Sequence, residues 1–144
     1  MKISYRWLQD IVEFTAEPKQ LAEDLTNCGV VVSTIKATPS DTIFELDLTT
    51  NRPDCLGHWG VAREIATLYK KPFEEKKIEL LECKQLTSSQ VSINIESDKL
   101  CQRYSARLIQ GVKVGPSPQW ICSSLSELGI NPHNNVVDVT NLVL

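Results

Sequence analysis

The chain has 144 residues, of which 42% are hydrophobic and 23% charged, a balance typical of a globular protein with one ordinary domain or two small ones. Its net charge of −3 excludes a global basic field for nonspecific nucleic-acid binding, so any RNA contact is local or comes from a partner. No apolar run approaches the roughly 20 residues that span a membrane. Polar residues interrupt the N-terminus, which excludes a signal peptide and predicts a cytoplasmic protein.

The first half of the chain predicts a small α+β domain, with elements in the order helix, helix, strand, strand, helix. Apolar residues at helical spacing follow Ser4, a candidate N-cap, over residues 7–12. A second helix is expected from Pro18 to Cys28, and Gly29 suits its C-terminal end. Residues 30–35 and 43–48 are predicted strands around a turn at 38–41, and residues 58–70 have the pattern of a helix.

The second half predicts the incomplete start of another α+β domain. We place the first domain at residues 1–75, a linker at 76–89 and the second domain at 90–144. Strands are expected at 90–95 and 104–112, and again from Val136. Between them lies a helix that begins at Ser117 and Pro118, ends at Gly129 and turns four apolar residues inward, namely Trp120, Ile121, Leu125 and Leu128.

The cysteines argue against two kinds of site. Their number is odd, their spacing is wide, and no C-x-x-C pair occurs among Cys28, Cys55, Cys83, Cys101 and Cys122. A disulfide framework and a zinc site are therefore disfavoured, and we expect reduced, mostly buried thiols. His58 and His133 have no partner at metal-ligand spacing, so we expect each to be structural or exposed to solvent.

Two sets of residues are candidates for RNA contact. In the loop Asn51-Arg52-Pro53-Asp54, Arg52 can form a fork with a carboxylate or a phosphate; the alternative is that the loop only shapes the connection between a strand and a helix. Arg103 and Tyr104 are adjacent, and both side-chain types stack on RNA bases; the alternative is a solvated strand edge. Gly57 and Gly60 do not form a nucleotide-binding fingerprint, and we attribute them to close packing of the helix on the sheet.

The last polar cluster lies within residues 134–141. Thr140 and Asn141 can orient a water molecule or bind a substrate hydroxyl, although the sequence offers no catalytic triad or paired carboxylates beside them. The chain then ends in an apolar run, which predicts that it is part of something longer. An unpaired strand there would leave its backbone unsatisfied, so we expect fraying from about Asn131.

Four runs together resemble the β subunit of bacterial phenylalanyl-tRNA synthetase. They occur in the family's order and cover nearly the whole chain. The runs are Met1-Lys2-Ile3-Ser4-Tyr5-Arg6-Trp7-Leu8, Asn51-Arg52-Pro53-Asp54-Cys55-Leu56-Gly57-His58-Trp59-Gly60-Val61-Ala62-Arg63-Glu64, Gly111-Val112-Lys113-Val114-Gly115-Pro116-Ser117-Pro118 and Asn134-Asn135-Val136-Val137-Asp138-Val139-Thr140-Asn141.

The resemblance implies an N-terminal fragment whose residues 1–75 are B1-like and whose residues 90–144 begin a B3/B4-like editing domain. The parent enzyme joins phenylalanine to its tRNA with ATP and Mg²⁺, which belong to the catalytic α subunit of an α2β2 assembly. The editing site hydrolyses tyrosine wrongly attached to that tRNA. The resemblance also implies that Thr140 lines the pocket of this site, with Asn141 beside it. It implies further that the fragment alone binds no cofactor and is inactive.

This chain departs from the family's pattern in two ways. An OB-fold tRNA-binding insertion is absent between Ile35 and Ile43, either naturally in this lineage or by engineering. The family's glutamine-proline-x-histidine segment, which follows the threonine, is also absent. The alternative function is a free-standing RNA- or protein-binding module with a synthetase-like fold, which predicts an ordered C-terminus at Leu144.

Overall fold

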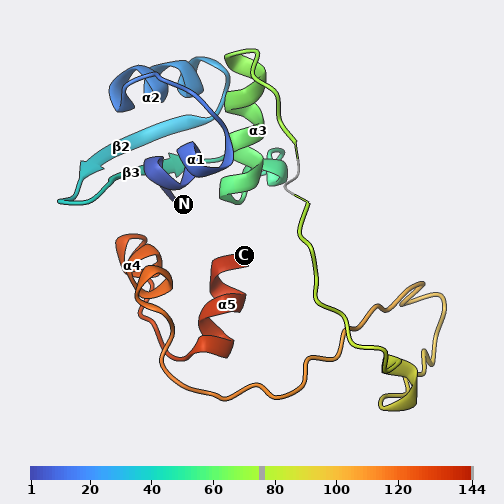
Figure 1. Ribbon diagram of the computed structural model, residues 1–144. Helices are drawn as coiled ribbons and strands as arrows, with labels where there is room; N and C mark the ends of the chain where they lie inside the picture. Colours follow the sequence, from blue (N-terminus) through green and yellow to red (C-terminus); the bar gives the residue numbers. More distant parts are fainter. Residues whose placement is uncertain (75–76, 144) are drawn as a thin grey trace. The chain divides into compact units, whose positions relative to one another are not determined.

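The computed structural model describes residues 1–74 and 77–143, which form helices and one small antiparallel sheet and so confirm the α+β class (Figure 1). The elements are β1 (Lys2–Ser4), α1 (Tyr5–Ile11), α2 (Pro18–Asn27), β2 (Val31–Ala37), β3 (Thr42–Asp47), η1 (Pro53–Cys55), α3 (His58–Leu68), η2 (Thr87–Ser89), α4 (Gln119–Glu127) and α5 (Asn135–Val143). Packing divides the chain into one unit, Met1–Glu75 with Val114–Leu144, and a second, Lys76–Lys113. No described helix is long and apolar enough to cross a membrane.

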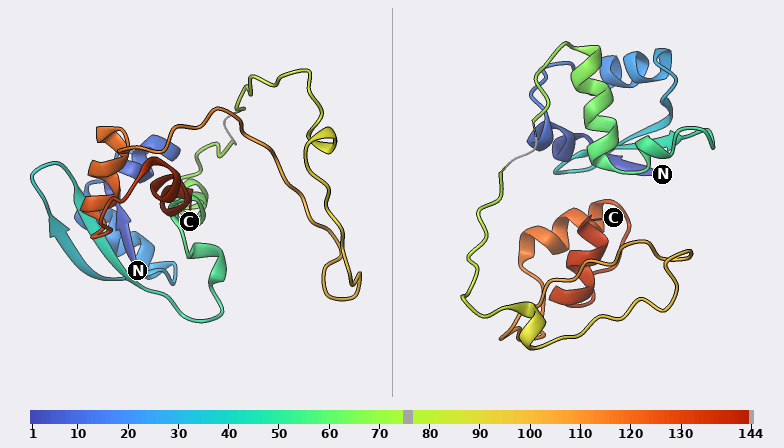
Figure 2. Two further views of the ribbon diagram at one scale, coloured as in Figure 1. Left: turned by 90° about the horizontal axis from the view of Figure 1, so that it is seen from below. Right: turned by 90° about the vertical axis from the view of Figure 1, so that its right-hand side faces the viewer.

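The sheet has the strand order β1-β3-β2, and both pairs are antiparallel. Phe44 of the central strand lies opposite Ile3 on one side and Ile35 on the other. Helices α1, α2 and α3 pack with this sheet, as Figures 1 and 2 show. They share a core whose fully buried members include Leu8, Leu21, Leu25, Phe44, Val61 and Ile65. The sequence analysis missed β1, because three residues are too few to show a period of two.

The ends of the first two helices follow the signals in the sequence. The Ser4 hydroxyl accepts the Trp7 backbone N–H at 2.9 Å and caps α1. Pro18 occupies the first turn of α2, and Gly29 follows that helix with a φ of 88°, a left-handed conformation that favours glycine. The ends of both helices thus confirm the predicted cap and end signals. Cys28, predicted to belong to the apolar face of the second helix, is exposed instead.

The β2–β3 hairpin confirms the predicted pair of strands and turn. Phe44 and Leu46 are buried while Glu45 and Asp47 are exposed, as alternation requires. The Thr38 N–H donates to the Asp41 carbonyl oxygen at 2.8 Å, which closes the connection. Four residues therefore join the strands directly, with no domain inserted at this position.

The predicted strands at 90–95 and 104–112 are wrong. Residues 77–113, as far as the structure describes them, contain η2 and no strand, and alternating side chains such as Ile93 and Leu108 are exposed. Alternation only makes a segment suitable for a sheet, whereas a strand exists only when a neighbour accepts its backbone hydrogen bonds. The predicted boundary at Glu75 and Lys76 falls outside the described residues, and the division into a 76–89 linker and a 90–144 domain stays a prediction.

Helix α4 confirms the predicted helix, with Ile121 and Leu125 buried and Gly129 at a φ of 81° after its end. One detail is wrong, because Trp120 points outward and is 61% exposed. The predicted strand from Val136 is also wrong, since residues 135–143 form α5. Most of the backbone groups of a helix bind one another, so α5 does not need the neighbouring strand whose absence led us to expect fraying. Leu144 itself lies outside the described residues.

Candidate functional site

The Arg52 loop joins β3 to α3 through a network of side-chain contacts. Nε of Arg52 donates to Oδ1 of Asp54 at 3.1 Å, and a terminal nitrogen of Arg52 donates to Oδ2 of Asp54 at 3.0 Å. The same nitrogen lies 3.2 Å from the Glu64 carboxylate of α3. The fork predicted for Arg52 is therefore formed with a carboxylate inside the chain.

These contacts shift the acidity of two neighbouring groups. The hydrogen bonds from Arg52 lower the pKa of Asp54 to about 2. Burial, together with a hydrogen bond to Asp54, raises the pKa of the Cys55 thiol to about 11, so this thiol is neutral and unreactive at physiological pH. Ligand atoms of Asp54, Cys55 and Glu64 lie within 4.8 Å of one another, but the Arg52 guanidinium already balances the carboxylates, and a cation would compete with it.

Gly60 explains why this loop is so tightly fitted. A Cβ atom on Gly60 would lie 1.7 Å from the Asp54 carbonyl oxygen, so only a glycine lets α3 approach the loop backbone. Gly60 does allow a close approach, but the prediction that α3 packs there on the sheet is wrong, because the backbone that it meets belongs to the loop at Asp54 and Cys55. The alternative given for the Arg52 loop, that it shapes the strand-to-helix connection, thus agrees with the geometry.

His58 is a structural residue at the start of α3. Its Nε2 accepts the Ser4 backbone N–H at 2.9 Å, and its ring lies 4.2 Å from the Trp7 ring, measured between centroids. Burial lowers the pKa of His58 to about 4, so the imidazole is neutral near pH 7. Within the described residues Cys55 is the one fully buried thiol. Cys28 and Cys83 are exposed and the other two cysteines are half-buried, so the prediction of mostly buried cysteines is wrong.

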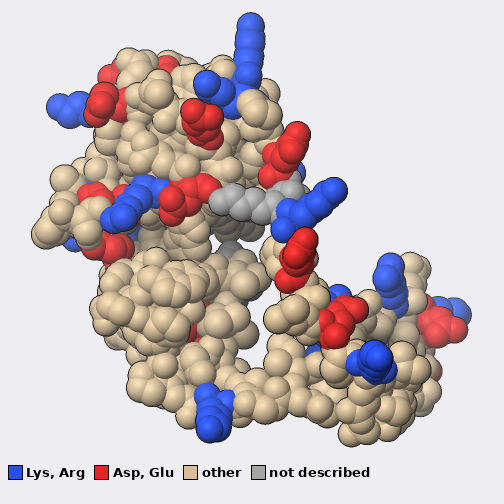
Figure 3. Space-filling view, in the orientation of Figure 1, with Lys and Arg blue, Asp and Glu red and all other residues tan. Residues whose placement is uncertain are grey.

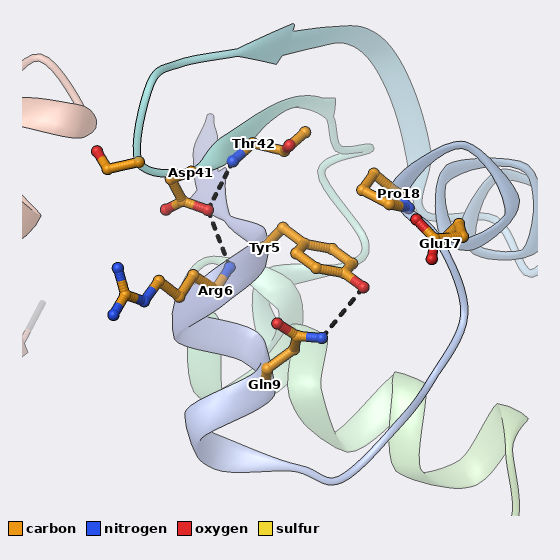
Figure 4. A pocket seen from close by; sticks show the side chains of 8 residues that line it. Tyr5, Arg6, Gln9, Glu17, Pro18, Asp41 and Thr42 are labelled. Atoms are coloured by element: carbon orange, nitrogen blue, oxygen red, sulfur yellow. Dashed lines mark hydrogen bonds between the residues drawn. The ribbon is translucent and has the colours of Figure 1, made fainter.

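A shallow pocket of about 380 Å³ lies where α1 meets the β2–β3 turn (Figure 4). The Asp41 carboxylate there accepts the backbone N–H groups of Arg6 at 3.0 Å and Thr42 at 2.6 Å. Gln9 donates to the Tyr5 hydroxyl at 3.1 Å, and that hydroxyl donates to a backbone carbonyl. These polar groups bind one another, and no nucleophile paired with a base occurs among the lining residues.

The polar residues within 134–138 anchor the start of α5. Oδ1 of Asn134 accepts the backbone N–H groups of Val136 and Val137, both at 3.0 Å, which is the geometry of a helix N-cap. The Asn135 N–H donates to the Gly115 carbonyl at 2.9 Å, and the Gly115 N–H donates back to Oδ1 of Asn135 at 3.1 Å. The start of α5 is thereby bound to the segment that precedes α4.

Asp138, in the first turn of α5, has no exposed surface. Its carboxylate accepts the Ser117 hydroxyl at 2.5 Å and the His133 backbone N–H at 2.8 Å. The Ser117 hydrogen bond is the main reason that the pKa of Asp138 is lowered. Sequence reasoning missed this role; the available signal was an Asn-Asn pair and an Asp where a helix can begin.

Thr140 and Asn141 lie in the middle of α5 but point in different directions. Successive residues of a helix are about 100° apart, so the two side chains do not share a face. The Thr140 hydroxyl is exposed and donates to the Val137 carbonyl at 2.6 Å. Asn141 is half-buried and lines a pocket of about 340 Å³ with Lys2, Trp7 and His58.

Arg103 and Tyr104 lie in an irregular segment rather than in a strand. The Tyr104 side chain is 64% exposed. The alternative of a solvated strand edge is therefore right about the exposure to solvent and wrong about the strand. Figure 3 shows acidic and basic side chains interspersed on the face in view, without a patch of one sign. This distribution agrees with the absence of a global basic field.

Comparison with known proteins identifies the family. A family model described as the B3/4 domain matches residues 100–144. A protein of Rhodopirellula baltica named phenylalanine–tRNA ligase beta subunit is 40% identical over 144 residues, which are 100% of this chain and 21% of that protein. Beta subunits of Fusobacterium nucleatum and Streptococcus agalactiae are 45% identical over 105 residues and 50% identical over 106 residues, covering 73% and 72% of this chain and 13% of each relative.

The chain belongs to the family of phenylalanine–tRNA ligase beta subunits. It spans about a fifth of the length of the Rhodopirellula relative and 13% of the other two. The α5 segment with Thr140 and Asn141 lies inside the residues that match the B3/4 domain, whereas the Arg52 loop lies outside them.

Proposed function

We propose that this chain is part of a phenylalanine–tRNA ligase β subunit, which attaches phenylalanine to its tRNA with ATP and Mg²⁺. In this proposal the β subunit works in the cytoplasm with a catalytic α subunit in an α2β2 assembly. ATP and Mg²⁺ bind at the aminoacylation site on the α subunit, and residues 1–144 bind no cofactor. The observation that carries the proposal is the 40% identity to a β subunit along the entire chain.

Within the β subunit, residues 1–75 form scaffold and α5 supplies one wall of a site that hydrolyses tyrosyl-tRNA. The match of residues 100–144 to the B3/4 domain supports this assignment. Such a site makes chemical sense, because a pocket that accepts phenylalanine poorly rejects a substrate that only adds a hydroxyl. A second site that binds the hydroxyl can separate the two amino acids.

The orientation of Thr140 suits recognition of that hydroxyl. Its proton is directed to the Val137 carbonyl at 2.6 Å, so the Thr140 oxygen offers its lone pairs to solvent. A phenol O–H from tyrosine can donate to this oxygen, and phenylalanine has no such donor. Asn141 lies a third of a turn away, so it serves another part of the bound aminoacyl group.

Contacts with tRNA by Arg103 and Tyr104 belong to the same proposal, since both side chains stack on bases and the Tyr104 ring is exposed. Arg52 is a weaker candidate, because its guanidinium binds the carboxylates of Asp54 and Glu64. An RNA contact by Arg52 would have to use the N–H groups that remain.

The editing role is tested by Thr140→Val in the complete β subunit assembled with its α subunit. Valine keeps the shape of threonine and removes the acceptor oxygen. We expect hydrolysis of tyrosyl-tRNA to slow by about tenfold or more, because the tyrosine hydroxyl loses its acceptor. Aminoacylation should be unchanged, and Thr140→Ser, which keeps the hydroxyl, should retain editing. Undiminished editing by Thr140→Val would remove Thr140 from the site.

Membership of a larger assembly has its own test. An antibody raised against residues 1–70 is used to probe native cell extract. A band several times heavier than the 16.2 kDa of this chain, co-purifying with a second subunit, supports the ligase proposal. A band at 16.2 kDa without a partner favours the free-standing RNA- or protein-binding module.

A further inference from the structure

Asp138 is a charged side chain with no exposed surface, and the described residues contain no other such case. A carboxylate is costly to bury unless hydrogen bonds replace the water that it loses. Here the replacement is complete on both oxygens, since Ser117 donates to Oδ2 at 2.5 Å and the His133 N–H donates to Oδ1 at 2.8 Å. The Asn134 N–H also lowers the pKa of Asp138. A simple helix cap does not require such burial, because Asn134 already caps α5.

The partners of Asp138 come from different parts of the chain. Ser117 precedes α4, 21 residues before Asp138, and His133 belongs to the loop between α4 and α5. Asp138 itself lies in the first turn of α5, so its carboxylate joins three segments at one point. The rotation of α5 about its axis is consequently fixed by this contact, as well as by the paired hydrogen bonds between Asn135 and Gly115.

We propose that Asp138 is a positioning residue for Thr140 and Asn141, a role that rests on the proposed editing function. Thr140 lies two residues beyond Asp138, about 3 Å further along the helix axis. Any rotation or tilt of the first turn therefore moves the Thr140 oxygen directly. Asp138 touches no substrate in this role; it acts by holding the helix on which the substrate-facing groups lie.

The surroundings of Asp138 explain why a carboxylate is needed. Its neighbours donate to it through one O–H and the backbone N–H groups. In Asp138→Asn, the side chain keeps its size but loses its charge and gains an NH2 group, which cannot accept a hydrogen bond. This group must face either a backbone N–H or the Ser117 hydroxyl, which would then have to turn and accept. The charge-assisted hydrogen bonds that hold the first turn of α5 are therefore lost without leaving a cavity.

The test uses the complete β subunit assembled with its α subunit, carrying Asp138→Asn, Ser117→Ala or Ser117→Thr. Rates of tyrosyl-tRNA hydrolysis are measured at several substrate concentrations. We expect Asp138→Asn to lower kcat for editing about tenfold to a hundredfold, the loss expected from misplacing a reacting group by about 1 Å. Ser117→Ala should have a smaller effect, and Ser117→Thr, which keeps the hydroxyl, should restore the rate. Asp98→Asn, at an exposed carboxylate, is the matched control.

A double variant separates positioning from a general loss of structure. If Asp138 acts through Thr140, Asp138→Asn combined with Thr140→Val should edit no worse than the more impaired single variant. The positioning role would be overturned if the losses of editing rate in the two single variants multiplied in the double variant, or if Asp138→Asn edited normally. Either result would leave the editing proposal intact. Normal editing by Thr140→Val would instead overturn the editing proposal itself. Aminoacylation by each variant should equal that of the unmodified enzyme, and its loss would show that Asp138→Asn disrupts the whole subunit.

Discussion

At the scale of single residues, Gly60 makes the sharpest prediction about stability. Its missing Cβ leaves room for the Asp54 carbonyl, which would otherwise lie at 1.7 Å. We expect Gly60→Ala to lower the free energy of unfolding by about 3 kcal/mol or more, because a rigid backbone must move to relieve the clash. Urea denaturation followed by tryptophan fluorescence measures the loss. Gly115→Ala is the control, since a Cβ there meets nothing within 4 Å; equal stability of the two variants would refute the packing argument.

His58 predicts how stability depends on pH. Its pKa is about 4 in the folded chain and ordinarily 6.5. The unfolded chain thus holds more protons between these values, so the contribution of His58 is complete above pH 6.5 and is lost as the pH falls toward 4. The loss approaches about 3 kcal/mol. His58→Gln can still accept the Ser4 N–H but does not titrate, so the difference in unfolding free energy between the chain and this variant should shrink on acidification. A difference independent of pH would contradict the assignment.

Local residue signals were readable in the sequence, whereas distant ones were not. Ser4 as a helix cap and Arg52 as a fork follow from neighbours within a few residues. The burial of Asp138 depends on Ser117, 21 residues away, and no periodicity or spacing rule connects the two. The exposure of Cys28 also depends on which face α2 turns to the sheet, so average burial preferences failed there.

At the scale of elements, the cap of α5 can be tested by itself. Asn134→Ala removes the acceptor of two backbone N–H groups and should destabilise the start of α5 by about 1 kcal/mol. Asn134→Asp keeps an acceptor and should be nearly neutral. Amide hydrogen exchange of Val139 and Thr140 reports the opening of the helix, and Asn131→Ala in the preceding turn serves as a control. Unchanged exchange in Asn134→Ala would show that the cap is dispensable.

The same helix shows why propensity misled the sequence analysis. Residues 136–139 contain three valines, which favour strands, but intrinsic preferences amount to less than about 1 kcal/mol per residue. The Asn134 cap and the two hydrogen bonds between Asn135 and Gly115 act together against that preference. Where no such contacts intervened, as in α2 and β3, the period of the apolar residues gave the right element.

At the scale of the whole molecule, the sequence resemblance predicts the family, whereas the packing decides where the proposed site residues lie. Four sequence runs were enough to predict the family. The second of them contains a position whose identity the backbone geometry restricts, because Gly60 of α3 lies against the Asp54 carbonyl. The placement of the proposed site residues could not be predicted, since it depends on α5 being a helix. The alternating residues of 91–95 and 104–110 also have no partner strand within the described part of the chain.

This last observation predicts a pattern of hydrogen exchange along the chain. Amides of β3, paired on both sides, should be protected nearly to the limit of global unfolding. Amides of residues 91–95 and 104–110 should exchange close to the unfolded rate, because the described backbone there lacks a ladder of hydrogen bonds. Mass spectrometry of peptic fragments resolves both regions in one experiment, with β3 as the internal control. Protection of alternate amides across 91–95 and 104–110 would show that these segments pair as strands in solution, as their sequence pattern indicates.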